Sequence, residues 1–196
     1  MDDLSERLFA HFVGGRWRVP FGTSPVAVRR ADGTRAGTVL LAEARDFARA
    51  QSGLRGAERG LRARLARHLE PFGMAEAILS APDAPAPLIL CADAEDRQAL
   101  GRAIGAGLHQ GLIWCPPPQA ALAATGIAKQ LQQADLPPGC FALLHAFTPQ
   151  TAPLIRATGL AQTGTDQKNA RAPNTFSTTS ARVMPISASS SSESEL

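Results

Sequence analysis

The sequence of 196 residues contains no tyrosine, and aromatic residues make up only 5% of it. Lysine is also scarce, because Lys129 and Lys168 are the only two, so arginine carries most of the basic charge. Proteins that bind single-stranded nucleic acids combine basic grooves with aromatic side chains on which the bases stack. A net charge of only +3 and the low aromatic content therefore argue against a nucleic-acid partner.

Cysteine is limited to Cys91, Cys115 and Cys140. The odd number and wide spacing are typical of reduced, buried thiols in a cytoplasmic protein rather than of a disulfide framework. No cysteine pair has the spacing of a zinc site, so we expect no metal. No apolar run reaches 18 residues, and the segment MDDLSERLFAHFVGG is too charged for a signal peptide, so we expect no membrane association.

The first third of the chain alternates turn signals with short apolar runs. Gly-Gly within residues 12–19 and Asp-Gly within residues 25–41 supply the positive φ angles that tight hairpins need, so both segments predict paired strands. Helices are expected over 43–52 and 57–69. In the second of these, Leu61, Leu65 and Leu69 recur at helical spacing, and the arginines between them form a solvated face.

The middle of the chain predicts an α/β fold. Continuous apolar runs at 87–92, 111–115 and 140–146 alternate with helical patterns at 94–108 and 118–134. Parallel strands covered on both faces are continuously apolar, and their crossover connections are right-handed helices. The expected architecture is a partial Rossmann-like parallel sheet with helical crossovers, preceded by short N-terminal strands and helices.

The C-terminal part changes character after residue 160. It is rich in Ser, Thr, Asn and Pro and has too few apolar residues to offset the entropy cost of ordering. The sequence therefore predicts two parts, a folded domain over 1–160 and a disordered Ser/Thr-rich tail over 161–196.

Four segments resemble the N-terminal, cofactor-domain half of an aldehyde dehydrogenase. In chain order they are FVGGRW (12–17), RADGTRAGTVLLAEARDFARA (30–50), ERGLRARLARHLE (58–70) and GLIWCPPPQAALAATGIAKQLQQADLPPGCFALLHA (111–146). The last is the most specific, because Leu-Pro-Pro-Gly at 136–139 is similar to the family's Leu-Pro-x-Gly turn at the same distance from the preceding strand. The chain resembles either a truncated member or the non-catalytic C-terminal module of two-module members.

The departures from the family pattern concern its chemistry. The resemblance places the family's cofactor-binding Lys on Cys115 and its ribose-binding Glu on Pro118, and neither replacement can make those contacts. The family's aldehyde-polarising Asn falls near Ala92, and the only asparagines here are Asn169 and Asn174, in the tail. The motifs with the family's catalytic Cys and Glu are not found. We therefore assign no catalytic, cofactor-binding or metal-binding residue.

Two other residues have both a functional and a structural interpretation. Cys115 stands at a strand end, where α/β proteins place their sites, yet a buried small side chain is the simpler interpretation. His145 lies in an apolar run and is more simply a core histidine than a base.

These features give two hypotheses for function. The first is a non-catalytic aldehyde-dehydrogenase-like protein without a cofactor. It would act in subunit assembly with another protein, such as a full-length aldehyde dehydrogenase, and would contact it through the Arg/Leu helix and an exposed sheet edge. The alternative is an NAD(P)-dependent aldehyde dehydrogenase, active alone or as part of a complex, with NAD or NADP as its cofactor.

Overall fold

The structure is a computed structural model that describes residues 7–57, 60–146, 149 and 151–164. Its strands are β1 (Leu8–Phe9), β2 (His11–Val13), β3 (Arg16–Arg18), β4 (Pro25–Arg29), β5 (Arg35–Leu40), β6 (Leu88–Cys91), β7 (Leu112–Trp114), β8 (Phe141–Leu143) and β9 (Ala161–Gly164). Its helices are α1 (Ala44–Ser52), α2 (Leu61–Leu69), α3 (Ala75–Ser80), α4 (Arg97–Gly107), α5 (Ala121–Gln133) and α6 (Ala152–Ala157), with single 3-10 turns at Glu70–Phe72 and Pro118–Ala120. None of the helices in these ranges combines the length and apolar character needed to cross a membrane.

The main sheet has six strands in the order β3-β2-β8-β7-β6-β9. Strands β8, β7, β6 and β9 run parallel, whereas β2 joins β8 in antiparallel orientation. Helix α4 connects β6 to β7 and α5 connects β7 to β8, as a parallel sheet with helical crossovers requires. The predicted α/β fold class is therefore confirmed.

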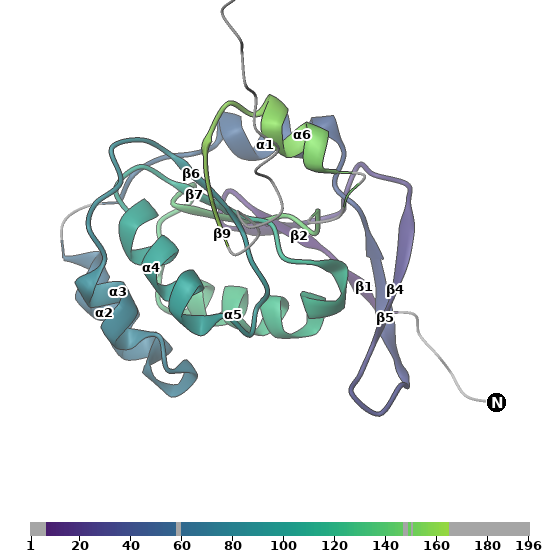
Figure 1. The fold of residues 1–196 in the computed structure, drawn as a ribbon, viewed down its shortest axis with the longest axis horizontal. Coiled ribbons are helices and arrows are strands. Elements are labelled where there is room, and N and C mark those ends of the chain that lie inside the picture. Colours follow the sequence, from purple (N-terminus) through teal and green to yellow (C-terminus); the bar gives the residue numbers. More distant parts are fainter. Residues whose placement is uncertain (1–6, 58–59, 147–148, 150, 165–196) are drawn as a thin grey trace, which may run out of the picture.

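Helices cover both faces of this sheet (Figure 1). Side chains alternate along β6, so that Leu90 packs with α2, α3, α4 and α5, whereas Ile89 and Cys91 pack on the other face with α1 and α6. Strands that are buried on both faces must be apolar at every position, which explains the continuous runs in the sequence.

The N-terminal strands form the two expected hairpins. Gly14 and Gly15 connect β2 to β3 with φ angles of 61° and 76°, the left-handed conformation that a two-residue hairpin needs. Strands β4 and β5 pair around a turn at Gly33. The sequence analysis did not predict β1, which pairs in parallel with β5 and completes a separate three-stranded sheet.

The leucine face of helix α2 packs against other helices of the same chain. Leu61, Leu65 and Leu69 are 6%, 0% and 0% exposed and pack in the core with α3, α4 and α5. Arg62 on the same helix donates to the backbone oxygens of Ala81 and Gly105. The leucine face of this helix is therefore not free for a partner.

Strand β9 begins directly after residue 160, where the sequence places the end of the folded domain. Residues 161–164, which the sequence placed in the tail, pair in parallel with all four residues of β6. The strand was missed because it is short and polar at its centre, and its first three residues are exposed at the sheet edge. The rest of the predicted tail, residues 165–196, lies outside the described residues.

Candidate functional site

The carboxyl ends of β6, β7 and β8 form the edge where α/β proteins usually bind ligands. Ala92 and Cys115, which follow β6 and β7, are both 0% exposed, and Pro118 begins the turn before α5 and is also buried. The indole Nε1–H of Trp114 donates to the Ala92 backbone oxygen at 3.0 Å, and the Cys115 N–H donates to the Leu90 oxygen at 2.8 Å. The positions that correspond to the family's cofactor residues therefore lie at the expected edge but are enclosed.

The exposed charges that directly follow β6 are acidic. Among the described residues that directly follow the three strands, namely 92–96, 115–118 and 144–146, there is no Lys or Arg. Asp93 and Glu95 are exposed there, and Asp96 caps α4 by accepting from the Ala99 N–H at 2.9 Å. A pyrophosphate group at this edge would meet carboxylates rather than cations.

Cys140, Cys91 and Cys115 form no disulfide with one another and are buried, with exposed fractions of 1%, 2% and 0%. Burial raises the pKa of the Cys115 thiol well above its usual value, and the neighbouring Cys91 on β6 adds to this effect. Burial also raises the pKa of Cys140. Because the thiolate is the nucleophile, neither Cys115 nor Cys140 is prepared for covalent catalysis, and the structural interpretation of Cys115 fits the geometry better.

His145 follows β8 and is 0% exposed. Burial lowers its pKa to about 3, with a further contribution from the charge of His11 and an opposing one from the Ala10 backbone. Within the described part of the chain neither ring nitrogen makes a hydrogen bond of ordinary geometry. The ring is a neutral core histidine at physiological pH, as the simpler interpretation predicted, although its nitrogens are not satisfied.

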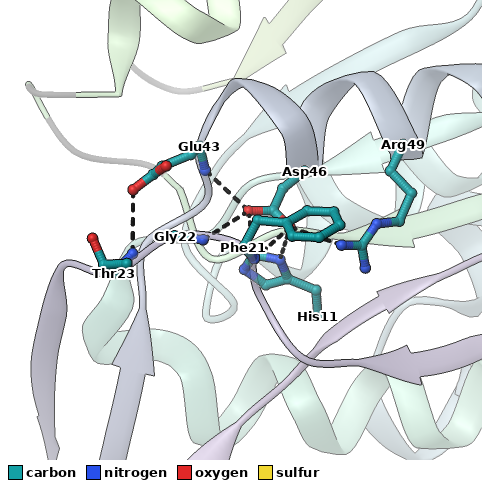
Figure 2. A network of polar contacts seen from close by, with 7 residues as sticks. All are labelled: His11, Phe21, Gly22, Thr23, Glu43, Asp46 and Arg49. Atoms are coloured by element: carbon teal, nitrogen blue, oxygen red, sulfur yellow. Dashed lines mark hydrogen bonds and ion pairs between the residues drawn. The ribbon is translucent and has the colours of Figure 1, made fainter.

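A second polar centre, which the sequence analysis missed, surrounds the carboxylate of Asp46 in the first turn of α1 (Figure 2). Asp46 is 1% exposed and accepts from the backbone N–H groups of Phe21 at 3.1 Å, Gly22 at 3.3 Å and Glu43 at 3.1 Å. His11 Nδ1 lies 3.5 Å and an Arg49 guanidinium nitrogen 3.7 Å from the same carboxylate.

The electrostatics of Asp46 follow from these contacts. Burial alone would raise the pKa of this carboxyl, but the His11 side chain and the N–H groups of Phe21 and Glu43 outweigh burial and lower it. Three backbone donors, the His11 imidazole and the Arg49 guanidinium leave little room for a substrate. This arrangement is a structural anchor, which fastens the loop at Phe21 and Gly22 to α1 and to β2.

The arginines near this anchor also have an aromatic neighbour. The guanidinium carbons of Arg45 and Arg49 lie 4.2 Å and 3.8 Å from the centre of the Phe21 ring, which is 41% exposed. These distances are those of cation–π contacts. The only sequence signal for the anchor was the acid in the first turn of α1, where helices commonly place one.

In the described part of the chain, no three His, Cys, Asp or Glu side chains come close enough together to hold a metal ion. Comparison with protein-family models gives no match, and comparison with curated proteins gives none either.

The fold of this chain matches that of solved aldehyde dehydrogenases. A Pseudomonas syringae aldehyde dehydrogenase C variant, solved with NAD+ and octanal, matches 79% of this chain and 49% of its own, with a TM-score of 0.62 and 14% identity. An aldehyde dehydrogenase from Bartonella henselae matches 74% and 43%, with a TM-score of 0.57 and 15% identity. A Δ-pyrroline-5-carboxylate dehydrogenase from Mycobacterium tuberculosis matches 75% and 39%, with a TM-score of 0.58 and 18% identity.

The chain therefore spans less than half the length of these three enzymes. The likeness shows a shared fold and confirms the resemblance to a truncated aldehyde dehydrogenase. What those enzymes bind and transform does not follow for this chain, because function depends on the site and not on the fold.

Proposed function

We propose that this chain is a non-catalytic, aldehyde-dehydrogenase-like subunit that acts by associating with a second protein chain. The observation that carries the proposal is the burial and charge of the residues that follow strands β6 and β7. Ala92, Cys115 and Pro118 are buried there, and the exposed charges beside them are the carboxylates of Asp93 and Glu95. Buried side chains and exposed carboxylates at this edge disfavour the binding of NAD or NADP.

The association surface that we propose is the outer edge of β9. This strand pairs only with β6 among the described strands, and Ala161, Gln162 and Thr163 are exposed. An edge strand presents unpaired N–H and C=O groups that another strand can satisfy. The match covers 49% of one such enzyme, so a partner with that fold has further structure beyond the shared part. A full-length aldehyde dehydrogenase encoded in the same organism is the partner we would test first.

Calorimetric titration of the full chain with NAD and with NADP tests the non-catalytic half of the proposal. We expect no saturable heat, because the strand ends provide no cation for the pyrophosphate. A dissociation constant below about 100 μM, which corresponds to roughly −5.5 kcal/mol, would overturn this half and favour the alternative of an NAD(P)-dependent aldehyde dehydrogenase.

Analytical ultracentrifugation of the chain mixed with that dehydrogenase tests the association half. The matched variants are Thr163→Lys on β9 and Thr23→Lys in the N-terminal loop, both at exposed positions. A lysine on an edge strand discourages strand pairing, so Thr163→Lys should weaken association at least tenfold and Thr23→Lys should not. Absence of a complex, or equal effects of the two variants, would contradict β9 as the association surface.

A further inference from the structure

A cavity of about 200 Å³ lies away from the Asp46 anchor, on the α5 side of the sheet. Its walls are residues 7–10, which include β1, together with Trp17 of β3 and the side chains of Thr125 and Lys129 of α5. The cavity exists because the N-terminal strands pass beside α5 without filling the space next to it. Its size slightly exceeds the roughly 150 Å³ of a cavity that holds benzene.

The walls combine cations with aromatic rings. Arg7 and Lys129 are exposed at the cavity, and none of its lining residues is acidic. Neither cation makes an ion pair in the described part of the chain, and Arg7 instead lies 5.0 Å from the centre of the Phe9 ring. Trp17 is half-buried, with its Nε1–H donated to Gln132 at 3.0 Å, so the ring is held in place.

Thr125 adds an unused polar group. Its side chain is 7% exposed, and its hydroxyl oxygen is buried with no hydrogen-bond partner among the described residues. A buried polar atom without a partner costs free energy, so such an atom in a folded protein needs an explanation. Threonine in a helix divides between two χ1 rotamers. A rotamer change at Thr125, which lines the cavity, therefore exchanges the positions of its methyl and hydroxyl groups.

We propose that this cavity binds a small organic carboxylate with a single ring or a short acyl body. The carboxylate would lie between Arg7 and Lys129, with the Thr125 hydroxyl as a further donor, and the apolar body would pack on Phe9 and Trp17. Charge-assisted hydrogen bonds provide the selectivity for an anion, and the apolar walls select against inorganic ions. None of the residues that line the cavity follows β6, β7 or β8 or belongs to β9, so the proposal does not rest on the proposed function.

Benzoate is the probe, and the indole N–H signals of the full chain in ¹⁵N–¹H NMR are the readout. The chain has two tryptophans, one at the cavity and one, Trp114, fully buried and bonded to Ala92, so the second is an internal control. Trp17→Phe assigns the two signals. We expect benzoate to shift the Trp17 signal saturably, with a dissociation constant of about 1 mM or lower, and to leave that of Trp114 unchanged.

Matched probes and variants identify the groups responsible. Benzamide, which is uncharged but similar in shape, should bind at least tenfold more weakly than benzoate. Lys129→Gln should weaken benzoate binding about tenfold, whereas Arg67→Gln, at an exposed position of α2, should not change it. Thr125→Val should weaken binding and Thr125→Ser should retain it.

Several results would overturn the proposal. These are a Trp17 shift that stays linear up to about 20 mM benzoate, equal affinity for benzoate and benzamide, or unchanged affinity in Lys129→Gln. Because Lys129 is exposed, its substitution leaves the core intact, so this last result can be interpreted even if the Thr125 variants fail to fold.

Discussion

His11 Nδ1 lies 3.5 Å from a carboxylate oxygen of Asp46, and both side chains are only 1% exposed. The contact joins β2, at the antiparallel side of the main sheet, to the first turn of α1 on its face. Together with the N–H groups of Phe21 and Gly22, it makes one carboxylate responsible for holding three separate segments (Figure 2).

Substitution Asp46→Asn should lower the free energy of unfolding by about 2–3 kcal/mol, because the amide keeps the volume but removes the charge that the backbone donors face. Urea denaturation at pH 7 measures the loss. The control Glu76→Gln, at an exposed position of α3, should change stability by less than about 0.5 kcal/mol. Similar values for the two variants would contradict the role of Asp46 as an anchor.

The pH dependence of Asp46 has a definite sign. Its pKa is lower in the folded protein than in the unfolded chain, so its contribution is complete above the unfolded value of about 3.9 and is lost as the pH falls through the folded value. Asp46→Asn should therefore differ less from the wild type in strong acid than at pH 7. Denaturation curves measured at about pH 3 and pH 7 test this expectation.

His145 should make the protein sensitive to milder acid. Its folded pKa of about 3 lies below the unfolded value of about 6.5, so the unfolded chain binds the proton in between. Stability should fall below about pH 6.5, with a contribution from this group that approaches 1.4 kcal/mol per pH unit. His145→Leu should flatten that slope, whereas His68→Leu, at an exposed position of α2, should keep it. A slope unchanged by His145→Leu would exclude this assignment.

The three thiols should be inert in the native protein. Cys91, Cys115 and Cys140 are at most 2% exposed, and burial disfavours the thiolate forms of Cys115 and Cys140. Titration with an aromatic disulfide reagent should detect no free thiol in native buffer and three in denaturant. Stoichiometric labelling of Cys115 in the native state would instead support the interpretation as a reactive thiol.

Gly139 closes the Leu-Pro-Pro-Gly turn, and its substitution by alanine should be costly. It has φ of 93°, and a β-carbon there would meet the backbone oxygen of Gly53. Gly159 has φ of 67° but open space around it, so it isolates the conformational cost alone. We expect Gly159→Ala to lose about 1 kcal/mol and Gly139→Ala about 3 kcal/mol. Equal thermal denaturation of the two variants would show that the contact with Gly53 is unimportant.

The sequence alone predicted those helices and strands that are determined by residues close together in the chain. Gly14 and Gly15 specify a hairpin by their own conformational freedom, and the apolar runs around Ile89, Ile113 and Ala142 specify strands because every position is buried. Helix α3 was missed because its six residues, Ala75–Ser80, lie in a short segment between prolines and are too few to show a period.

The features that escaped prediction depend on distant residues. The pairing of β1 with β5, Leu8 to Thr38, involves a two-residue strand that has no pattern of its own. The anchor at Asp46 forms because the loop at Phe21 folds back over α1. An acidic residue near the start of a helix does not indicate that a distant loop will bind it. The cavity beside Thr125 is likewise a property of packing between the N-terminal strands and α5.

The pairing of Phe12 with Leu143 has a consequence for how the molecule is made. About 130 residues separate the two, so a ribosome adding roughly 5–20 residues per second needs on the order of 10 s between them. During that interval the β2–β3 hairpin has no neighbouring strand, and Phe12 and Val13 lack the sheet that later buries them. The newly made hairpin therefore exposes Phe12 and Val13 until β8 has been synthesised.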